Sequence, residues 1–461
     1  MQLHLNLTIF GGTGDLTFRK LVPALYMMSR TGALPGASRI LIIGRRSYTS
    51  AQYRLEAEAW VRKFARLKFD AAAWSKFTEQ LVYYQMDFTK PEAYPALGEF
   101  LAQDQIEEHL CYFAVAPRFF SGITTGLTTI PGMNRAKIIL EKPFGENLPQ
   151  ARELNAQLEN FVGKGGIYRI DHYLGKEMVR NMQTIRFANQ VFKQVWNSGA
   201  IAAVEISALE DVGVETRGDY YDASGALKDM VQNHLFQVLT MLAMEEPEKF
   251  TAAGIHAAQL QVLRALKKPA AADLVLGQYA GYRQEPKVNP DSTTETYACL
   301  KLQLDNPRWQ GTPFYIRTGK KTGVRETEVS VFFKRVRHDI EPNVLRIMIQ
   351  PTEGVDFRFN IKQPGESKAI IPAEMNFCQS CNIEFHRNTP EAYERLLAAC
   401  MQGDQAWFSQ WDQIEASWAF VEELKQVAAA AKIPVYEYAE GSRGPKEAEE
   451  LLAQDGLKWI E

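Results

Sequence analysis

The sequence predicts an α/β domain with a doubly wound parallel sheet, followed by an α+β domain with a large, mostly antiparallel sheet. In about the first 170 residues, short apolar runs alternate with helical patterns, which is typical of a parallel sheet with helical crossovers. After residue 200, strand-like runs follow one another with short connections, which favours antiparallel pairing. A chain of 461 residues has room for two such domains, and we place them at residues 1–172 and 173–461.

The first domain opens with residues 3–9, in which leucine or isoleucine alternates with polar residues, as expected of a strand. A Gly-rich turn follows. Residues 15–32 then carry apolar side chains at helical spacing up to Gly32, which suits a helix C-cap. Residues 51–68 predict a charged amphipathic helix, and further strands are expected at 40–44, 81–88, 110–117 and 136–145.

The second domain begins with a predicted strand at residues 201–210 and a long helix over 223–244. Residues 391–431 return to a helical pattern near the end of the chain. Four strands are expected between these helices, at 292–305, 312–319, 328–336 and 343–351. Since no helix separates these four strands, they are expected to pair in an antiparallel sheet.

The composition excludes several classes of partner. Basic and acidic residues number 52 and 55, a net charge of −3, so neither a nucleic acid nor an anionic membrane surface is expected to bind. No apolar run reaches the roughly 18–20 residues that a membrane span needs, and the first residues lack the pattern of a secretory signal. Five cysteines are few for a disulfide framework, so we expect a cytoplasmic protein in a reducing compartment.

A strand, the segment GGTGDL and a helix follow one another at the start of the chain. This order places backbone N–H groups and a helix N-terminus where they can hold a phosphate, as in Rossmann-like domains. The G-x-x-G spacing differs from the common G-x-G-x-x-G fingerprint and is equally found in ordinary turns, but its position favours a coenzyme loop. The candidate coenzyme-binding residues are Gly11, Gly12, Thr13, Gly14, Asp15 and Leu16.

Two arginines, Arg45 and Arg46, follow the second predicted strand. An acidic residue at this place suits the ribose 2′-hydroxyl of NAD, whereas arginine suits the 2′-phosphate of NADP. Adjacent arginines are also common in solvated turns. Beside a Gly-rich loop, the pair favours NADP over NAD.

Four polar residues lie close together in the segment YRIDHYLGKE: Asp171, His172, Tyr173 and Lys176. Lysine supplies a point charge, and histidine and tyrosine supply directed donors, so the group could hold a phosphoryl group. The alternative is a capped helix start with an exposed lysine.

His234 lies on the apolar face of the helix predicted over residues 223–244. A histidine in that position is more often a core residue than a catalytic one. It becomes a candidate base if a carboxylate fixes its tautomer and raises its basicity. Asp171 and Asp229 are both candidates for that carboxylate.

Several remaining charged and sulfur-bearing residues have two interpretations. Lys142, Lys320 and Arg325 follow predicted strands and are solvated charges unless they converge on an anionic substrate. Cys378 and Cys381 form a CxxC pair; without a second pair, two ordinary thiols are expected in preference to a zinc site. No metal site, Ser-His-Asp signature or HExxH helix is expected.

A series of motifs resembles the glucose-6-phosphate dehydrogenase family, in the family's order and over nearly the whole chain. The segment RIDHYLGKE followed by D-x-x-x-N-H-L is the most specific part of the resemblance. The motifs are GGTGDLTFRK (11–20), EKPFG (141–145), RIDHYLGKE (169–177), KDMVQNHLFQ (228–237), RTGKK (317–321) and GSRGP (441–445).

The resemblance implies an oxidoreductase of carbohydrate metabolism that enters the oxidative pentose phosphate pathway. The implied substrate is β-D-glucose 6-phosphate, oxidised at C1 to the 6-phosphogluconolactone. The implied hydride acceptor is NADP, with NAD as second choice, and no metal takes part. A homodimer or homotetramer is also implied, with the antiparallel sheet as the interface; Phe332, Phe333, Ile347 and Ile349 could serve this interface or the core.

The resemblance also assigns roles to individual residues. His234 matches the general base and Asp171 its carboxylate partner, which favours Asp171 over Asp229 for that role. The matches to the substrate site are His172, Tyr173 and Lys176 for the phosphate, Lys142, Glu210 and Asp229 for the sugar hydroxyls, and Lys20, Lys320 and Arg325 for further contacts. Lys142 also matches a position near the nicotinamide. The matches to the coenzyme site are residues Gly11 to Leu16, Arg45 and Arg46, and, for the adenosine, Asp87, Phe88 and Tyr112.

The sequence departs from the family at a few positions. Phe18 replaces a frequent basic residue in the coenzyme loop, which predicts a weaker phosphate contact. Met348 stands where animal relatives have arginine, so a second, structural NADP site is not expected.

Two alternatives stay open at this point. One is an oxidoreductase of similar layout that acts on another sugar or polyol. The other is a sugar-phosphate-binding protein without catalysis.

Overall fold

The computed structural model describes residues 2–365, 368–381 and 389–460. The chain falls into two compact units. The first unit comprises Met1–Gly175 and Thr389–Trp411, and the second comprises Lys176–Asn388 and Asp412–Glu461. Each unit therefore contains two separate stretches of sequence.

The first unit is built, within its described residues, on a six-stranded sheet in the order β3-β2-β1-β4-β5-β6. Every neighbouring pair is parallel. The chain order reverses between β1 and β4, and in doubly wound sheets ligands bind beyond the strand ends at such a reversal. The strands are β1 (Gln2–Phe10), β2 (Ser38–Gly44), β3 (Leu81–Gln85), β4 (Gln105–Phe113), β5 (Lys137–Leu140) and β6 (Ile167–Arg169).

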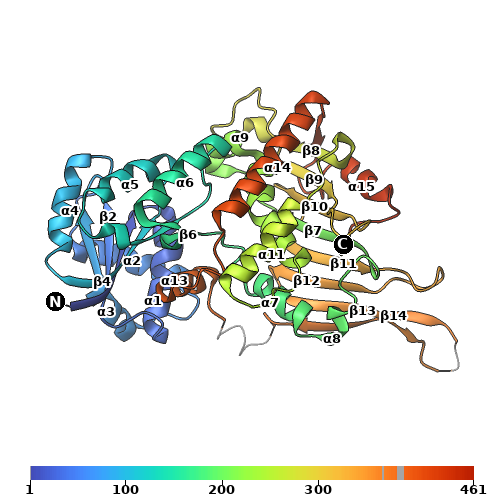
Figure 1. Cartoon of the computed structure of the whole chain (residues 1–461), viewed down its shortest axis with the longest axis horizontal. Coiled ribbons are helices and arrows are strands. Elements are labelled where there is room, and N and C mark those ends of the chain that lie inside the picture. Colours follow the sequence, from blue (N-terminus) through green and yellow to red (C-terminus); the bar gives the residue numbers. More distant parts are fainter. Residues whose placement is uncertain (1, 366–367, 382–388, 461) are drawn as a thin grey trace. The chain divides into compact units, whose positions relative to one another are not determined.

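Helices lie on both faces of this sheet (Figure 1). Local signals set several of their ends: Gly32, with a φ of +77°, ends α1, and Thr49 and Gln52 form a capping box at the start of α2. The α-helices are α1 (Val22–Thr31), α2 (Ser50–Phe64), α3 (Ala71–Gln80), α4 (Tyr94–Leu101), α5 (Phe120–Thr128), α6 (Leu148–Val162) and α13 (Ala392–Gln402). The segment η1 (Thr17–Leu21) is π-helical, and short 3₁₀ turns are η2 (Pro91–Ala93), η3 (Pro117–Phe119), η4 (Met133–Arg135) and η5 (Lys164–Gly166).

Helix α13 belongs to the first unit although it follows most of the second unit in sequence. Its residues Leu396, Leu397 and Cys400 have no exposed surface and share one core with side chains of β1, β2 and β4. Arg66, after α2, donates to the carboxylate of Glu394 at 2.8 Å. The helix therefore completes the apolar core of the first unit.

The second unit contains, among the residues that the structure describes, a nine-stranded sheet in the order β14-β13-β12-β11-β7-β10-β9-β8-β15. Six of its neighbouring pairs are antiparallel, and β7–β10 and β8–β15 are parallel. The strands are β7 (Ile201–Leu209), β8 (Leu274–Tyr279), β9 (Tyr297–Leu302), β10 (Phe314–Gly319), β11 (Glu326–Phe333), β12 (Val344–Gln350), β13 (Gly354–Lys362), β14 (Ile370–Cys378) and β15 (Val435–Tyr438).

The helices of the second unit pack on this sheet around fully buried tryptophans, Trp196, Trp309 and Trp418. The indoles of Trp196 and Trp309 donate to the carbonyls of Leu242 and Ala243 at 2.8 Å. The α-helices are α7 (Glu177–Phe187), α8 (Gln190–Lys193), α9 (Gly218–Ala226), α10 (Phe236–Ala243), α11 (Ala252–Arg264), α14 (Trp411–Ala430) and α15 (Lys446–Ala453). The segment η7 (Leu227–Leu235) is π-helical, and 3₁₀ turns are η6 (Glu215–Arg217), η8 (Ala271–Asp273) and η9 (Tyr282–Gln284).

The predicted fold class is confirmed for both sheets. The long helix expected over 223–244 is divided, because Gly225 takes a φ of +68° and the residues after it wind as a π-helix. Strands β8, β13, β14 and β15 were not predicted. Phe332, Ile347 and Ile349 are buried within the single chain, which favours the core over the interface for these three residues.

The expectation of two ordinary thiols in the CxxC pair is wrong. Cys378 and Cys381 are joined by a disulfide. The remaining cysteines, Cys111, Cys299 and Cys400, are free and buried.

Helices of the described residues do not combine the length and the apolar composition that crossing a membrane requires.

Candidate active site

The Gly-rich loop after β1 has no room for a side chain at Gly11 or Gly12. Gly11 has a φ of +89°, and a Cβ there would lie 2.2 Å from the carbonyl oxygen of Ala114. A Cβ on Gly12 would lie 2.1 Å from Cγ2 of Ile42. The N–H of Gly14 and the hydroxyl of Thr17 both donate to the carbonyl of Gly11 at 3.0 Å. A loop of this kind, free of bulky side chains and placed before a helix, fits the pyrophosphate of a dinucleotide.

Phe18 does not face this loop. Its ring is buried and lies parallel to the rings of Tyr53 and Trp60, at centroid distances of 5.3 and 5.7 Å. The hydroxyl of Tyr53 donates to the carbonyl of Gly12 at 2.8 Å. Phe18 therefore acts on the loop by packing beneath it, together with a tyrosine that the sequence analysis missed.

Arg45 and Arg46 are both exposed in the turn after β2. Arg46 donates to the hydroxyl of Tyr48 at 3.1 Å and lies 3.7 Å from the carboxylate of Glu56. Arg45 lies near Asp87, which follows β3. A hydrogen bond from the Thr89 hydroxyl lowers the pKa of Asp87 first, and the charge of Arg45 lowers it further. Both arginines thus have exposed guanidinium groups at the ribose end of a doubly wound site.

The predicted adenosine contacts lie in different surroundings. Phe88 is half-buried, and its ring meets those of Phe10 and Phe119 edge-on at 6.3 and 5.5 Å. Tyr112 is fully buried, so its ring has no surface to offer an adenosine, and its hydroxyl donates to Glu141 at 2.5 Å. Tyr112 instead holds the carboxylate of Glu141, the residue before Lys142, by a hydrogen bond.

Glu141 is the centre of a hydrogen-bonded group that the sequence analysis did not single out. Burial raises the pKa of its carboxyl to about 6, although hydrogen bonds from Tyr112 and Tyr393 oppose the rise. Tyr393 comes from α13. The turn that carries Lys142 is therefore held by residues from β4 and α13.

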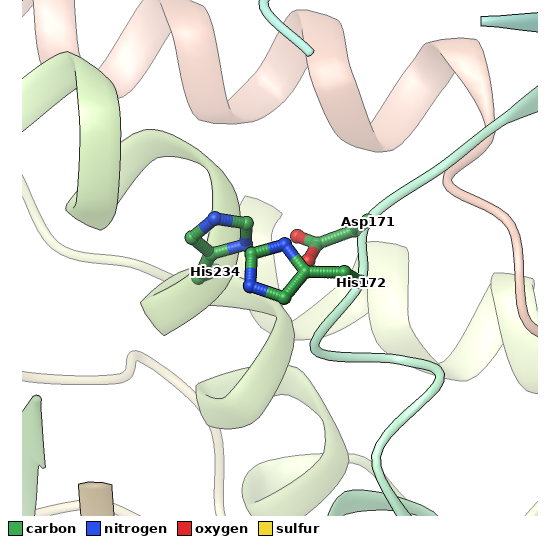
Figure 2. A group of neighbouring side chains, drawn as sticks. All are labelled: Asp171, His172 and His234. Atoms are coloured by element: carbon green, nitrogen blue, oxygen red, sulfur yellow. The ribbon is translucent and has the colours of Figure 1, made fainter. Parts of the chain in front are cut away.

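The segment after β6 carries Asp171 and His172 (Figure 2), and Tyr173 follows them in the sequence. The carboxylate of Asp171 is buried and accepts the backbone N–H of Tyr173 at 2.9 Å. The rings of His172 and Tyr173 lie 5.0 Å apart. A Cβ on Gly175 would lie 2.8 Å from Cβ of Ala392, and Arg395 donates to the carbonyl of Gly175 at 2.6 Å, so α13 also holds this segment.

Lys176 begins the second unit, immediately before α7. Its ammonium group donates to the side-chain oxygen of Gln350, at the end of β12. The amide nitrogen of Gln350 donates in turn to the hydroxyl of Thr327 at 3.0 Å. The sequence analysis missed Gln350 as a partner of Lys176, because the two residues lie far apart in the chain.

His234 lies on the π-helical segment η7 (Figure 2). Its side chain is 1% exposed. The start of η7 is held by Glu295, whose carboxylate accepts the N–H of Leu227 at 3.1 Å. π-helical turns are often found at functional sites, and here η7 also carries Asp229. The carboxylate of Asp229 accepts the hydroxyl of Tyr220 at 3.1 Å.

Glu210 and Lys320 meet where the parallel strands β7 and β10 end. Leu209 is paired with Gly319, and the ammonium group of Lys320 donates to the Glu210 carboxylate. The same ammonium group lies 5.4 Å from the centre of the Tyr221 ring. Burial raises the pKa of Tyr221 well above its ordinary value, and the charges of Asp229 and Glu210 add to this rise. Three of the predicted substrate residues are thus neighbours in the second unit.

Two predicted substrate residues are more exposed. Lys20, on η1, lies 3.7 Å from the carboxylate of Glu391. Arg325 is exposed in the segment before β11.

A dinucleotide-fitting loop on a doubly wound sheet, with a second α+β unit that carries acidic, basic and imidazole groups, defines an NAD(P)-dependent oxidoreductase. Family models agree: the glucose-6-phosphate dehydrogenase NAD binding domain matches residues 8–181, and the glucose-6-phosphate dehydrogenase C-terminal domain matches residues 183–460. The chain belongs to the glucose-6-phosphate dehydrogenase family.

Individual relatives cover nearly the whole chain. Glucose-6-phosphate 1-dehydrogenase of Bacillus subtilis (strain 168) is 39% identical, over 98% of this chain and 97% of its own. A solved glucose-6-phosphate dehydrogenase in complex with its substrate glucose-6-phosphate has a TM-score of 0.92 at 31% identity, over 100% of this chain and 99% of that one. A glucose-6-phosphate 1-dehydrogenase from Mycobacterium avium has a TM-score of 0.88 at 32% identity, with the same coverage.

Proposed function

We propose that this oxidoreductase oxidises β-D-glucose 6-phosphate at C1 and transfers the hydride to NADP, forming 6-phospho-D-glucono-1,5-lactone and NADPH. The observation that carries the proposal is the full-length likeness to a solved relative described as a complex with its substrate glucose-6-phosphate. The residues that match the family's substrate and base positions are all present in this chain.

His234 is proposed as the general base that takes the proton of the C1 hydroxyl, and Asp171 as its carboxylate partner. The burial of both side chains supports these roles, because a dry carboxylate orients an imidazole and raises its basicity. When bound, the nicotinamide ring supplies the hydride acceptor. Proton removal by a positioned base contributes typically about 10²–10⁴-fold to the rate.

His172, Tyr173 and Lys176 are proposed to hold the substrate phosphate. The Lys176 ammonium is already held by Gln350, which supports a fixed position for its charge. Lys142, Glu210 and Asp229 are proposed for the sugar hydroxyls, and Lys20, Lys320 and Arg325 for further contacts. The contact between Glu210 and Lys320 supports their placement in one group.

The coenzyme is proposed to lie on the loop from Gly11 to Leu16, with NADP preferred to NAD. The exposed guanidinium groups of Arg45 and Arg46 support this preference, since guanidinium binds phosphate through paired hydrogen bonds. Asp87 and Phe88 are proposed for the adenosine. Tyr112 is proposed to position Glu141 and, through it, the backbone beside Lys142.

Self-association as a homodimer or homotetramer is proposed through the end of the large sheet formed by β13 and β14. Large apolar side chains are exposed there: Ile361, Ile370, Met375 and Phe377. Such side chains on one sheet end mark an interaction surface in a folded protein. We propose a cytoplasmic location and functional domains at 1–172 and 173–461.

The deciding experiment follows NADPH absorbance with glucose 6-phosphate as substrate, with NAD and NADP tested in parallel. The proposal expects turnover with glucose 6-phosphate and a higher kcat/KM with NADP. Turnover only with another sugar or polyol would contradict the substrate. Binding of glucose 6-phosphate without any turnover would identify a silent binding protein instead.

A further inference from the structure

The hydrogen bonds of segment η7 join residues that are five apart in sequence. At its end, the backbone N–H of Phe236 donates to the carbonyl of Val231. Within it, the side-chain amide of Asn233 donates to the carbonyl of Lys228 at 2.9 Å. Both bonds span five residues, as in a π-helix, whereas an α-helix bonds residues four apart. The buried side chain of Asn233 thus supports the π-helical winding.

This winding decides whether Asp229 and His234 lie on the same side of the helix, because the two residues are five apart in sequence. In an α-helix, at about 100° per residue, they would point about 140° apart around the axis. In a π-helix, bonds between residues five apart stack those residues, as bonds between residues four apart do in an α-helix. The π-helix therefore brings the proposed base and a proposed contact to the sugar hydroxyls onto one side.

Glu295, just before β9, holds the start of this helix with two acceptor oxygens. Its carboxylate accepts the N–H of Leu227 at 3.1 Å, and its backbone carbonyl accepts the N–H of Ala226 at 3.0 Å. Glu295 and Leu227 are both buried, and a buried N–H that loses its acceptor is costly. The first N–H of η7 therefore depends on the Glu295 side chain, while the backbone bond to Ala226 does not.

The turn before η7 is shaped to admit this carboxylate. Gly225 has a φ of +68°, and a Cβ there would lie 2.4 Å from the nearest carboxylate oxygen of Glu295. Burial raises the pKa of the Glu295 carboxyl, while the charge of Lys425 and the N–H of Leu227 oppose the rise. Glu295 is thus fitted by shape and by hydrogen bonding into the point at which the π-helix begins.

We propose that Glu295 and Asn233 are positioning residues, which fix the π-helical winding of η7 and so turn Asp229 and His234 toward one substrate. The inference rests on the proposed function of those two residues. Displacing a reacting group by about 1 Å can cost about 10²-fold in rate. Lys176, a proposed phosphate contact, lies outside η7, so turnover should depend on the winding more than substrate binding does.

The first test measures kcat and KM of the full-length variants Glu295→Gln and Glu295→Leu with glucose 6-phosphate and NADP. Glutamine keeps a side-chain oxygen for the Leu227 N–H, so Glu295→Gln is expected to keep kcat within about threefold of the wild type. Leucine has no acceptor, so Glu295→Leu is expected to lower kcat about tenfold or more and to change KM less. Asp291→Leu, the same change at an exposed acid of the same loop, is the control and should match the wild type.

Two results of this test would overturn the role of Glu295. One is a wild-type kcat in Glu295→Leu. The other is an equal loss in Glu295→Gln and Glu295→Leu, because that loss would come from the charge and not from the acceptor oxygen.

The second test uses Asn233→Ala, which removes the other side-chain bond of the winding and does not depend on the folding of Glu295→Leu. This variant is expected to lower kcat about threefold or more and to change KM for glucose 6-phosphate less. In the double variant Asn233→Ala/Glu295→Leu, the loss of kcat should be smaller than the product of the two single losses, because both changes disturb one winding. A wild-type kcat in Asn233→Ala, or fully multiplicative losses, would overturn the shared role.

Crystal structures of Glu295→Gln and Glu295→Leu test the physical cause. Residues 227–235 are expected to keep bonds between residues five apart in Glu295→Gln and to change to bonds between residues four apart in Glu295→Leu. An unchanged π-helix in Glu295→Leu would overturn the positioning mechanism. Absence of turnover of glucose 6-phosphate by the wild type would instead contradict the proposed function, and the two crystal structures would still test the hold of Glu295 on η7.

Discussion

His234 owes its position to an irregular helix. Gly225 takes a left-handed φ of +68°, and a Cβ there would lie 2.4 Å from the Glu295 carboxylate that holds the first N–H of η7. This arrangement winds residues 227–235 as a π-helix, which changes the face on which each side chain lies. Because Gly225 and Glu295 set the backbone of η7, a substitution at His234 is expected to change its side chain and to leave the π-helical backbone in place.

We expect His234→Asn to lower kcat at least about 10²-fold and to leave KM for glucose 6-phosphate nearly unchanged, because only the base is removed. Steady-state kinetics measures both constants. The exposed His338 supplies the control, since His338→Asn should match the wild type. A near-normal kcat in His234→Asn would contradict the role of the base.

Lys176→Ala is expected to raise KM for glucose 6-phosphate by roughly ten- to a hundredfold, because a charge-assisted hydrogen bond to the phosphate is lost. KM for free glucose is expected to change far less. Kinetics with both sugars measures this difference. Lys193, an exposed lysine that pairs with Glu246, gives the control variant Lys193→Ala. Equal effects of Lys176→Ala on both sugars would exclude a phosphate contact.

Arg46→Ala is expected to lower kcat/KM for NADP relative to NAD by about tenfold or more, because a guanidinium–phosphate contact is lost. The ratio of the two kcat/KM values is the measurement. Arg45→Ala is the matched variant from the same turn. If the ratio changes only in Arg45→Ala, the 2′-phosphate contact belongs to Arg45.

The site residues that could be predicted from the sequence are those that lie close together in one recognisable segment. Asp171, His172, Tyr173 and Lys176 lie within one short segment, so their types and spacing suffice. Gln350 reaches Lys176, and Tyr393 reaches Glu141, from distant parts of the chain. These contacts cannot be predicted from a single sequence.

At the scale of elements, strands β9 to β12 could be predicted because buried residues dominate them. Strands β13 and β14 could not, since most of their residues are half-buried or exposed and the apolar pattern that marks a strand is weak. The π-helical segments η1 and η7 also leave no periodic signal that separates them from an α-helix.

Strand β7 carries a buried acid, Glu205, which makes the stability of the folded protein depend on pH. Burial raises the pKa of Glu205 to about 8 from its ordinary value of 4.5, and Glu328 adds to the rise, while the N–H of Ile460 and the charge of Arg317 oppose it. The folded state therefore binds a proton that the unfolded chain releases near pH 4.5. Its contribution to stability is present at low pH and is lost as pH rises through about 8.

We expect Glu205→Gln to remove this loss of stability at high pH. The free energy of unfolding of the variant should exceed that of the wild type by an amount on the order of a few kcal/mol above pH 8, and the difference should shrink toward pH 5. Urea unfolding across this pH range measures it. Glu437→Gln, at an exposed position of β15, should follow the wild type at every pH. A wild-type pH profile in Glu205→Gln would contradict the burial of a neutral acid.

At the scale of the whole molecule, the first unit needs two distant stretches of sequence. Residues 1–175 contain its sheet, but α13 supplies buried side chains to the same core. It also donates hydrogen bonds to Glu141 and to the carbonyl of Gly175. The first unit is therefore not separable by a single cut.

A fragment of residues 1–175 is expected to unfold at a lower temperature than the same fragment joined by a flexible linker to residues 389–411. Burial of several apolar side chains of α13 is worth about 1.5–3 kcal/mol for each large one, which exceeds the cost of the linker. Thermal unfolding followed by circular dichroism measures the difference. The linked fragment with Leu396→Asp and Leu397→Asp is the control and should behave like residues 1–175 alone; equal stability of all three would contradict the structural role of α13.

The place of α13 in the chain also determines when the first unit can complete its fold during translation. On the ribosome, all six strands of the first sheet have emerged before the second unit begins, yet α13 appears only about 200 residues later. During that interval the nascent first unit presents the uncovered apolar surface that chaperones recognise. We expect a chaperone to stay bound to the nascent chain until α13 has left the exit tunnel, and a chain that stalls before residue 389 to be a substrate for degradation.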